Sequence, residues 1–346
     1  MKILKQIVGV DVAQKELVVA FGRLKGDLSV EILSSKVFTN NVKGFEKLLA
    51  WTKSLADTQC NVQYVMEATG VYHESFAYYL YDHGLAVSIV LPNKISNYFK
   101  TLEVKTITDS TSAEAITRFG LERNTQLWSR PKPIFKSLRQ LTRERDQIVL
   151  MRTMVKNHLH AELAEAEPGK TSVERMEAQI TMLNAQEREI KKEITKLAQD
   201  PQVKNGITVM SSIPGVALLT SATVLAETNG FELIRNKKQL ASYAGFDVRE
   251  KQSGTSVKGK PKISKRGNKY LRKCLYMPVL ATIRSDQHYK SFYARLVERH
   301  GIKMKAAVAV QRKVLELMYT LYKKNERYDK NYESSQNGRK KERQVL

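Results

Sequence analysis

Cysteine is scarce in this chain, with only Cys60 and Cys274 among 346 residues. Two cysteines exclude a disulfide framework, and neither belongs to a CxxC pair of the kind that holds structural zinc. The six histidines form no ligand pattern, since His158 and His160 lie two apart on a predicted helix and point to different faces. The cysteine usage therefore favours a reducing, cytosolic compartment.

Long apolar runs are also missing from the sequence. No stretch is apolar over the length needed to cross a bilayer. The first residues, KILKQIVGVDV, reach the acid Asp11 without the apolar core of a signal peptide. A membrane is therefore not among the expected partners.

Acidic residues are few relative to basic ones. The chain contains 35 Asp and Glu against 58 Lys and Arg, which leaves a formal net charge of +23. A surplus of this size favours a polyanionic partner, such as DNA, RNA or an acidic membrane surface, over solubility as its sole purpose. Because no membrane segment is present, nucleic acid is the first expectation.

The first 125 or so residues alternate strand and helix patterns. Three β-branched runs with short polar links predict an antiparallel meander. A helix, a buried strand that ends at Glu67, a helix that ends at Gly84, a further strand and more helical segments follow. This order predicts an α/β domain in which helices cover a mixed sheet. The three runs of the meander are 6–12, 16–22 and 28–38.

Two long heptad-like patterns occupy the middle of the chain. Apolar residues recur at near-heptad spacing over 138–163 and again over 176–197, and Pro168–Gly169 breaks the pattern between them. The pair predicts an antiparallel coiled-coil hairpin. Some positions of its seam are charged: Arg145, Arg152 and Glu187.

From about Val203 the patterns are mostly helical. The turn at Pro214–Gly215 indicates a helix–turn–helix hairpin whose glycine can approach a phosphate backbone, while an ordinary helix start capped by Ser211 or Ser212 is the alternative. A basic, glycine-rich loop over 248–273 then enters a helix. After about Asn325 the chain is polar and basic, which is typical of disorder.

Three acids stand where an α/β sheet displays chemistry. Asp11 and Glu67 each close an apolar strand, and Asp109 precedes a helix. Carboxylates gathered at one sheet edge repel one another unless a cation lies among them, and such hard ligands suit Mg²⁺ or Mn²⁺. Two such ions can activate a nucleophile and stabilise the leaving oxygen in phosphodiester chemistry.

Structural explanations remain open for two of these acids. Asp11 could cap the turn that follows it, and Asp109 could cap its helix. Glu67 is harder to explain in this way, because its segment is otherwise apolar and an unpaired buried carboxylate is costly.

Six segments together carry a family resemblance. They are GVDVAQKELVVAF, MEATGVYHESFAYYL, TDSTSAEAITRFG, IPGVALLTSATVLAE, LASYAGF and SGTSVKGKPKISKRGNKYLR, in this order. As a set, they resemble the DEDD-type transposases of the insertion-sequence one-ten group over about residues 5–325. The resemblance implies an N-terminal domain of the RuvC or RNase H type, a coiled coil and a mostly helical C-terminal transposase domain.

The resemblance also implies a function and partners. It implies a DNA recombinase of the bacterial cytoplasm, associated with the nucleoid, that moves its own insertion sequence. A structured non-coding guide RNA would pair with donor and target DNA. Because recombination joins two DNA partners, we expect a homodimer or homotetramer, with the coiled coil as a contact. The expected parts are a metal-binding domain at 1–128, the hairpin at 129–202, a helical domain with the serine loop at 203–325 and a disordered tail at 326–346.

The resemblance assigns roles to individual residues. The Mg²⁺-binding acids correspond to Asp11, Glu67 and Asp109. The nucleophile, which forms a covalent phosphoserine link, corresponds to Ser253 in KQSGTS, and Ser256 is its rival. No histidine lies near Ser253, so cations and bound metal would have to polarise the phosphate.

One departure from the family pattern concerns the metal site. Ser112 stands where the family usually has a fourth acid, one helical turn after Asp109. A hydroxyl binds a hard cation more weakly than a carboxylate does. Either water takes this position, or the enzyme is weakened, or, least favourably, Glu114 approaches the metal.

The loop around Ser253 is rich in cations, which bind backbone phosphates without reading sequence. Base pairing with the guide RNA would then supply the specificity. The residues expected to contact nucleic acid are Lys258, Lys260, Lys262, Lys265, Arg266, Lys269 and Arg272.

Two other functions remain open at this point. A metal-dependent nuclease of the RuvC type would use the acids without the serine, and the absence of a covalent protein–DNA adduct would identify it. A non-catalytic nucleic-acid-binding relic is the third possibility, since Ser112 is compatible with a decayed metal site. Metal titration of Asp11→Asn against the parent distinguishes that case.

Overall fold

The computed structural model describes residues 2–68, 70–102, 108–232, 234–250, 252–253, 257–259 and 262–330. At 252–253 and 257–258 it describes the backbone alone. The chain divides into two compact units, Met1–Arg130 and Pro131–Leu346, each with its own hydrophobic core.

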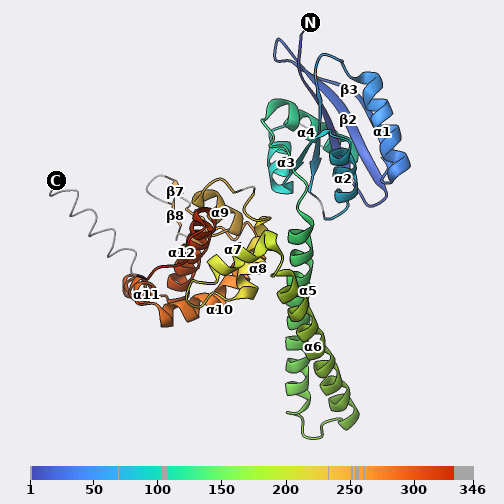
Figure 1. Ribbon diagram of the computed structural model, residues 1–346. Helices are drawn as coiled ribbons and strands as arrows, with labels where there is room; N and C mark the ends of the chain where they lie inside the picture. Colours follow the sequence, from blue (N-terminus) through green and yellow to red (C-terminus); the bar gives the residue numbers. More distant parts are fainter. Residues whose placement is uncertain are drawn as a thin grey trace, which may run out of the picture. The chain divides into compact units, whose positions relative to one another are not determined.

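A five-stranded mixed sheet forms the centre of the first unit, with the strand order β3-β2-β1-β4-β5 (Figure 1). The first three strands pair antiparallel, which confirms the predicted meander, and β4 and β5 continue the sheet parallel to β1. Side chains alternate across the sheet, so Ile7 lies in the core on one face and Val8 in the core on the other. The strands are β1 (Ile3–Val12), β2 (Glu16–Lys25), β3 (Val30–Thr39), β4 (Val62–Glu67) and β5 (Ala86–Val90).

Helices cover both faces of this sheet, as the α/β prediction required. The larger core, on the face of Val8, contains buried side chains from α1 and α2, and the smaller core, on the face of Ile7, contains side chains from α3 and α4. Figure 1 shows the same division. The helices are α1 (Val42–Leu55), α2 (Glu74–Asp82), α3 (Pro92–Phe99) and α4 (Asp109–Glu122).

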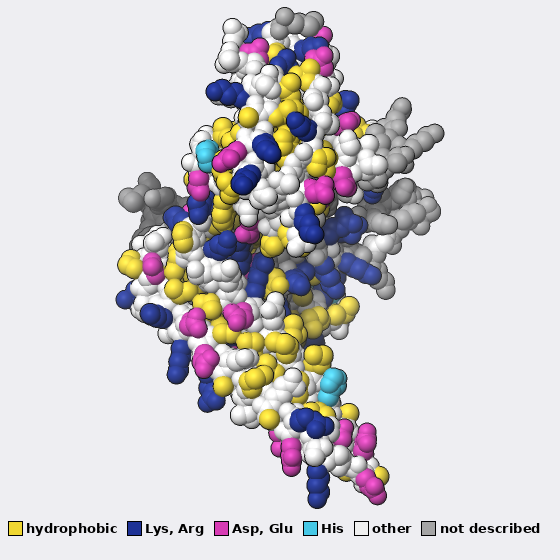
Figure 2. Space-filling model, turned by 90° about the vertical axis from the view of Figure 1, so that its right-hand side faces the viewer, with side chains coloured by type: hydrophobic (Ala, Val, Ile, Leu, Met, Phe, Trp, Pro, Cys, Tyr) yellow, Lys and Arg dark blue, Asp and Glu magenta, His cyan; other side chains and the backbone are white. Residues whose placement is uncertain are grey.

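The second unit begins with a hairpin of two long helices, α5 (Pro133–Glu162) and α6 (Lys170–Leu197). They pack along each other through buried apolar residues, and the predicted break at Pro168–Gly169 separates them. Supercoiling of the pair as a coiled coil stays a prediction. Figure 2 shows apolar side chains interspersed with charged ones on the outer surface of the hairpin. The exposed apolar residues there include Leu150, Met151, Met154 and Met182.

The charged residues that interrupt the seam of the hairpin meet one another. Glu187, whose side chain is 7% exposed, accepts hydrogen bonds from Arg145 Nη2 at 2.8 Å and from Arg152 Nη1, and pairs with Lys191 Nζ at 2.9 Å. Burial opposes ionisation of the carboxyl group, but the hydrogen bonds from Lys191 and Arg152 and the charges of Arg145 and Lys191 lower its pKa to about 2. This ionic cluster fixes the register of the hairpin, because a slip of one turn would separate the carboxylate from both arginines.

We expect Glu187→Gln to destabilise the second unit by about 3–5 kcal/mol at pH 7, because removing one partner leaves two partly buried guanidinium groups without a counter-charge. The carboxyl group has a lower pKa in the folded than in the unfolded chain, so its contribution is present above about pH 4.5 and is lost as the pH falls toward 2. The difference in the free energy of unfolding between variant and parent should therefore become smaller as the pH falls from about 4.5 to about 2. Urea unfolding at a series of pH values measures it.

The matched control is Glu189→Gln, on the same helix at an exposed position. It should change the free energy of unfolding by less than about 0.5 kcal/mol. Equal effects of the two substitutions, or a pH-independent effect at Glu187, would contradict the role of the ionic cluster.

Helices α7 to α12 and four short strands make up the rest of the second unit. Their apolar faces share one core with the base of the hairpin. Among the described ranges, none of the helices combines the length and apolar character needed to cross a membrane. The helices are α7 (Pro201–Met210), α8 (Leu218–Thr228), α9 (Lys237–Ala244), α10 (Lys269–Ser285), α11 (Gln287–His300) and α12 (Lys303–Lys324).

The turn between α7 and α8 packs against α10. Gly215 has a φ of 87°, and a Cβ at this position would overlap Thr282 and the carbonyl of Pro278 in α10. The Thr282 hydroxyl also donates to the carbonyl of Pro214 at 2.6 Å. The side of Gly215 on which a Cβ would lie is therefore filled by α10, but Gly215 also lines a pocket of about 490 Å³. The approach of a phosphate to this turn stays a prediction. The serine-cap alternative is wrong, because Ser211 ends α7 and Ala217 is the N-cap of α8.

The basic loop contains two short antiparallel ladders that the sequence did not predict. β6 (Val248–Arg249) pairs with β9 (Lys262–Ile263), and β7 (Gln252–Ser253) pairs with β8 (Val257–Lys258). A lysine- and glycine-rich stretch gives no alternating apolar pattern, which explains why these strands were missed.

The described chain continues past Asn325. Tyr328 donates its main-chain N–H to the hydroxyl of Ser212 at 2.8 Å, and its own hydroxyl donates to Asp286 Oδ2 at 2.7 Å. Residues 326–330 thus fold back onto the helical core. The remainder of the predicted tail, 331–346, lies outside the described residues.

Candidate active site

The sheet brings Asp11 and Glu67 to the same end and the same face. β1 and β4 run parallel in a register that pairs Gly9 with Val65 and continues toward Asp11 and Glu67 at their ends. Because side chains alternate, Asp11 shares its face with Gly9, and Glu67 shares its face with Val65. That is the face covered by α4.

Helix α4 lies directly on β1 because Gly9 has no side chain. A Cβ at Gly9 would overlap Thr117 and the carbonyl of Ala113. The buried Thr117 hydroxyl accepts a hydrogen bond from the Gly9 N–H at 3.1 Å and lies 3.0 Å from the carbonyl of Ala20. This contact sets the position of the helix along the strand.

The direction of α4 then places Asp109 at the acidic end of the sheet. Gly120 near the end of the helix packs on Ile7, and the middle of the helix packs on Gly9 two residues further along β1. The helix therefore runs antiparallel to β1, and its first residue, Asp109, reaches the end of the strand at Asp11. The structure thus brings together the three acids that the sequence singled out.

The capping explanation is wrong for Asp109, and the turn after Asp11 has a main-chain hydrogen bond of its own. Thr108 is the N-cap of α4, and its hydroxyl accepts from the N–H of Thr111 while its own N–H donates to the Thr111 hydroxyl at 2.8 Å. The turn after β1 is closed by the main chain, from the Ala13 N–H to the Glu16 carbonyl at 2.9 Å. Neither Asp109 nor Asp11 is therefore needed to cap its element.

Burial and like charges both act on the carboxyl group of Asp11. Partial burial raises the pKa of Asp11 to about 6, and the negative charges of Asp109 and Glu67 raise it further. A hydrogen bond to the main chain of Val12 acts in the opposite direction. A cation at this point would relieve the repulsion that a like-charged group adds to the cost of burial.

The described residues nevertheless contain no group of three acidic, histidine or cysteine side chains already close enough to hold a metal ion. The acids fit a hard cation by type and by placement, but an ion would have to draw them closer. Ser112 lies half-buried on α4 one turn after Asp109, and Glu114 is also half-buried.

Asn40 is a residue of this site that sequence reasoning missed. Its side-chain amide donates to the carbonyl of Ala13 at 2.9 Å and to the carbonyl of Tyr72 at 3.2 Å. It thereby links the turn that follows Asp11 to the segment that follows Glu67. An asparagine after a strand has the appearance of an ordinary turn residue, so the sequence offered no signal.

Ser253 lies in the second unit, on strand β7, where its backbone pairs with Val257. Its side chain, the side chain of Lys258 and the whole of Ser256 and Lys260 lie outside the described residues. Four of the predicted nucleic-acid contacts are exposed beside this loop: Lys262, Lys265, Arg266 and Lys269.

Arg272 differs from the exposed cations of the loop. It is half-buried, and its Nη1 donates to the carbonyl of Ala244 at 2.7 Å and to the carbonyls of Gly267 and Asn268 at 3.3 Å each. This nitrogen is engaged within the protein, so the contact of Arg272 with nucleic acid stays a prediction for the rest of its side chain.

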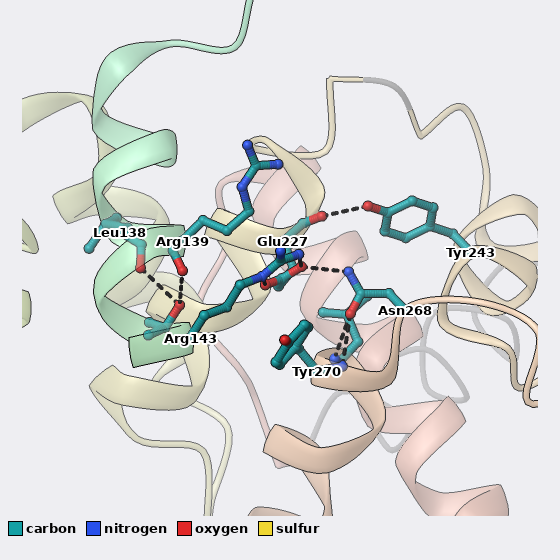
Figure 3. A network of polar contacts seen from close by, with 9 residues as sticks. Leu138, Arg139, Arg143, Glu227, Tyr243, Asn268 and Tyr270 are labelled. Atoms are coloured by element: carbon teal, nitrogen blue, oxygen red, sulfur yellow. Dashed lines mark hydrogen bonds and ion pairs between the residues drawn. The ribbon is translucent and has the colours of Figure 1, made fainter. Parts of the chain in front are cut away.

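A second network that the sequence did not reveal surrounds Glu227 at the end of α8 (Figure 3). Its carboxylate accepts two hydrogen bonds from Arg143 and one from Asn268, the residue directly before α10. The signal for this network in the sequence was weak, because Glu227 is simply the one acidic residue in α8.

Comparison with protein families identifies the chain. A transposase family model, DEDD_Tnp_IS110, matches residues 8–168, and a model described as "Transposase IS116/IS110/IS902 family" matches residues 207–294. The chain belongs to the IS110 family of transposases. This transposase is therefore an enzyme of DNA recombination, which confirms the resemblance read from the sequence.

Individual relatives of this transposase include a DNA-inverting protein. The pilin gene-inverting protein of Moraxella bovis is 27% identical over 339 residues, covering 94% of this chain and 98% of the relative. The transposase for insertion sequence element IS1111A of Coxiella burnetii is 31% identical over 125 residues, covering 34% of this chain and 33% of the relative.

Among solved structures, the transposase is similar to T. thermophilus RuvC in complex with a Holliday junction substrate. The TM-score is 0.28 at 9% identity, covering 36% of this chain and 99% of RuvC. The α/β assignment of the first unit rests on its own strand order and helical layers.

Proposed function

We propose that this transposase is an RNA-guided, site-specific DNA recombinase that cleaves and rejoins DNA through Ser253. Asp11, Glu67 and Asp109 would hold the divalent metal that assists the reaction. The observation that carries the proposal is that these residues lie within the segments matched by the two transposase family models. The three acids lie within 8–168, and the serine lies within 207–294.

The acids are the residues that would hold Mg²⁺ or Mn²⁺. Their support is the shared face of β1, β4 and α4 and the raised pKa of Asp11, which burial and, after it, the negative charges of Asp109 and Glu67 cause. Ser112 would offer a neutral oxygen or hold a water molecule in the fourth position. When bound, the metal would polarise a phosphate oxygen and stabilise the charge that develops during strand cleavage.

The serine step conserves the phosphodiester energy. The Ser253 hydroxyl attacks the phosphorus, a serine–phosphate bond forms, the bond to one deoxyribose oxygen breaks, and the serine proton is released as the leaving oxygen gains one. Attack by a deoxyribose hydroxyl of the second DNA on this phosphoserine reverses the chemistry and rejoins the strands. No external energy source or redox partner is needed.

The basic loop would hold the DNA backbone, while base pairing with the guide RNA would select the sequence. The support is the exposure of four cations beside β9 and α10 together with a net charge of +23. The full set proposed to contact nucleic acid is Lys258, Lys260, Lys262, Lys265, Arg266, Lys269 and Arg272. At least two copies of the chain, as a homodimer or homotetramer at the bacterial nucleoid, would bring donor and target DNA together.

RNA guidance is tested by mixing the full chain, Mg²⁺, labelled duplex DNA from the flank of the gene and RNA transcribed from the same flank. We expect a denaturant-resistant protein–DNA adduct and a recombined product that appear with the RNA and disappear after ribonuclease treatment. Equal adduct formation without RNA would contradict guidance. Nicked DNA without any adduct would instead favour a metal-dependent nuclease.

A further inference from the structure

Glu227 is a buried carboxylate at an unfavourable place. Its side chain is 1% exposed, and it lies at the C-terminal end of α8, where the helix dipole disfavours negative charge. Burial of a carboxylate is tolerated when it is paired and hydrogen-bonded. Arg143 of α5 satisfies this condition with two hydrogen bonds, from Nε at 2.7 Å and from Nη2 at 2.8 Å (Figure 3).

The third hydrogen bond to Glu227 comes from the last residue before α10. Asn268 Nδ2 donates to the carboxylate at 2.6 Å. The other side-chain atom of Asn268, Oδ1, accepts from the N–H groups of Tyr270 at 2.9 Å and Leu271 at 3.2 Å, and so caps α10. One amide therefore joins the start of α10 to Glu227 and ends the loop that carries Ser253.

The other end of this loop converges on the same carboxylate residue. The Tyr243 hydroxyl, from α9, donates to the carbonyl of Glu227 at 2.8 Å, and the carbonyl of Tyr243 accepts from the N–H of Asn268 at 2.7 Å (Figure 3). Gly267 permits this approach, because a Cβ there would meet the carbonyl of Tyr243 and the N–H of Gly245. Both stems of the loop are thus tied together at Glu227.

A second pair of hydrogen bonds closes the stems nearer to the strands. Ser264 donates its N–H to the carbonyl of Asp247 at 2.7 Å and its hydroxyl to Asp247 Oδ1 at 2.7 Å. The ladder of β6 with β9 continues from this point toward Ser253. A set of contacts therefore runs from the buried carboxylate to the ladder of β6 with β9, which precedes the ladder of β7 with β8 that carries Ser253.

The pocket beside this network offers no alternative explanation for its charges. It has a volume of about 490 Å³ and lies between α5, α8 and α10. Three basic side chains line it, and each is already paired with an acid: Arg143 with Glu227, Arg145 with Glu187, and Lys273 with Asp146 at 2.5 Å. An anionic ligand in this pocket would have to break one of these ion pairs.

We propose that Glu227 and Asn268 are positioning residues that brace the stems of the Ser253 loop against α5, so that the serine is held ready for attack. The proposal rests on the proposed role of Ser253 as nucleophile. In this role neither residue would act on the reacting atoms directly, so their removal should slow adduct formation without weakening the binding of DNA.

Three variants separate this bracing from the capping of α10. Asn268→Ser keeps a good helix cap but cannot reach Glu227. Asn268→Asp also keeps the cap but places a carboxylate against a carboxylate. Glu227→Gln combined with Asn268→Asp restores the hydrogen bond between the two residues with donor and acceptor exchanged, and the carboxylate introduced at position 268 replaces the lost negative charge beside Arg143 Nη2, which no longer has an acceptor on residue 227. The matched control is Glu232→Gln, which removes an exposed ion pair with Lys132 but leaves Asn268 untouched.

The experiment measures three quantities on the full chain, using the flank-derived DNA and RNA with Mg²⁺. They are the single-turnover rate of adduct formation, the affinity for the DNA and the amide exchange of peptides covering 246–268. We expect both single Asn268 variants to lose about 10- to 100-fold in rate, since misplacement of reacting groups by about 1 Å has effects of this size. The DNA affinity should be unchanged, the loop peptides should exchange faster, and the exchanged pair should recover most of the rate.

The outcomes distinguish the two proposals. A parental adduct rate and parental exchange in Asn268→Ser would overturn the bracing, as would failure of the double variant to recover when it folds as stably as the parent. An adduct formed by Ser253→Ala would overturn the proposed nucleophile instead. In that case the amide exchange of 246–268 still decides whether Glu227 braces the loop.

Discussion

Ser253→Ala is expected to abolish the covalent protein–DNA adduct and to lower recombination by at least about a thousandfold, because loss of a nucleophile removes the covalent route entirely. Binding of DNA should be retained, since the cations beside β9 and α10 are unchanged. The measurement is the yield of denaturant-resistant adduct on labelled flank DNA, together with the affinity of the same DNA for the protein.

Ser256→Ala is the matched control, because it removes a hydroxyl from the same loop. It should form the adduct at close to the parental rate. If Ser256→Ala loses the adduct while Ser253→Ala keeps it, Ser256 is the nucleophile. If neither variant changes a cleavage that yields free nicks, a nuclease without a serine intermediate describes the enzyme.

Asp11→Asn is expected to lower recombination by at least about a hundredfold. The reason is that the metal supplies several kcal/mol of charge stabilisation, and about 3 kcal/mol corresponds to this factor. Addition of Mg²⁺ should raise the melting temperature of the parent by binding its folded state, and it should not raise that of the variant. Calorimetry with and without Mg²⁺, in parallel with recombination assays, measures both effects.

Without metal, the same substitution should stabilise the first unit. The pKa of Asp11 is raised to about 6, and a shift of two units corresponds to at most about 3 kcal/mol. The half-exposed side chain is screened by water, which reduces the expected gain to about 1 kcal/mol, or about 2–4 °C in melting temperature.

The sign of the pH dependence follows from the same shift. The folded chain binds a proton at Asp11 more readily than the unfolded chain does, so the metal-free parent should gain stability as the pH falls from about 7 toward 4. Asp11→Asn should lack this gain. Asp27→Asn is the control, because hydrogen bonds with Ser29 lower the pKa of that exposed acid and its loss should not stabilise the protein. Destabilisation by Asp11→Asn in the absence of metal would contradict the repulsion.

The order of elements in the first unit was predictable because each pattern there is strong. β-Branched runs and short polar links defined the meander, and Gly84, with a φ of 71°, follows the end of α2 as predicted. The gathering of Asp11, Glu67 and Asp109 was also predictable in outline, because strand ends and helix starts meet at one edge. The sequence could not show that α4 packs on β1 through Gly9 and Thr117. A glycine in a strand indicates a close approach but does not identify the residue that approaches.

Other features depended on pairings between distant residues. Arg145, Arg152 and Glu187 were visible as exceptions to the apolar seam, but their mutual contacts required the register of the hairpin. Glu227 and Asn268 lie 41 residues apart and carry no local signal of their contact. The packing of α10 against Gly215 had no signal in the sequence, because a glycine in a turn can serve a ligand or a neighbouring helix with the same local conformation.

Helix α5 takes part in two of these clusters at once. Arg143 and Arg145 are separated by one residue, yet the first holds the stem of the serine loop through Glu227 and the second holds the partner helix through Glu187. The ion pairs of Glu187 make α5 and α6 rotate together, and the long arm that they form cannot rotate about its own axis without straining the attachment of Arg143 to Glu227. A torque applied to the far end of that arm, for example by a second molecule bound there, would therefore twist the base of the serine loop.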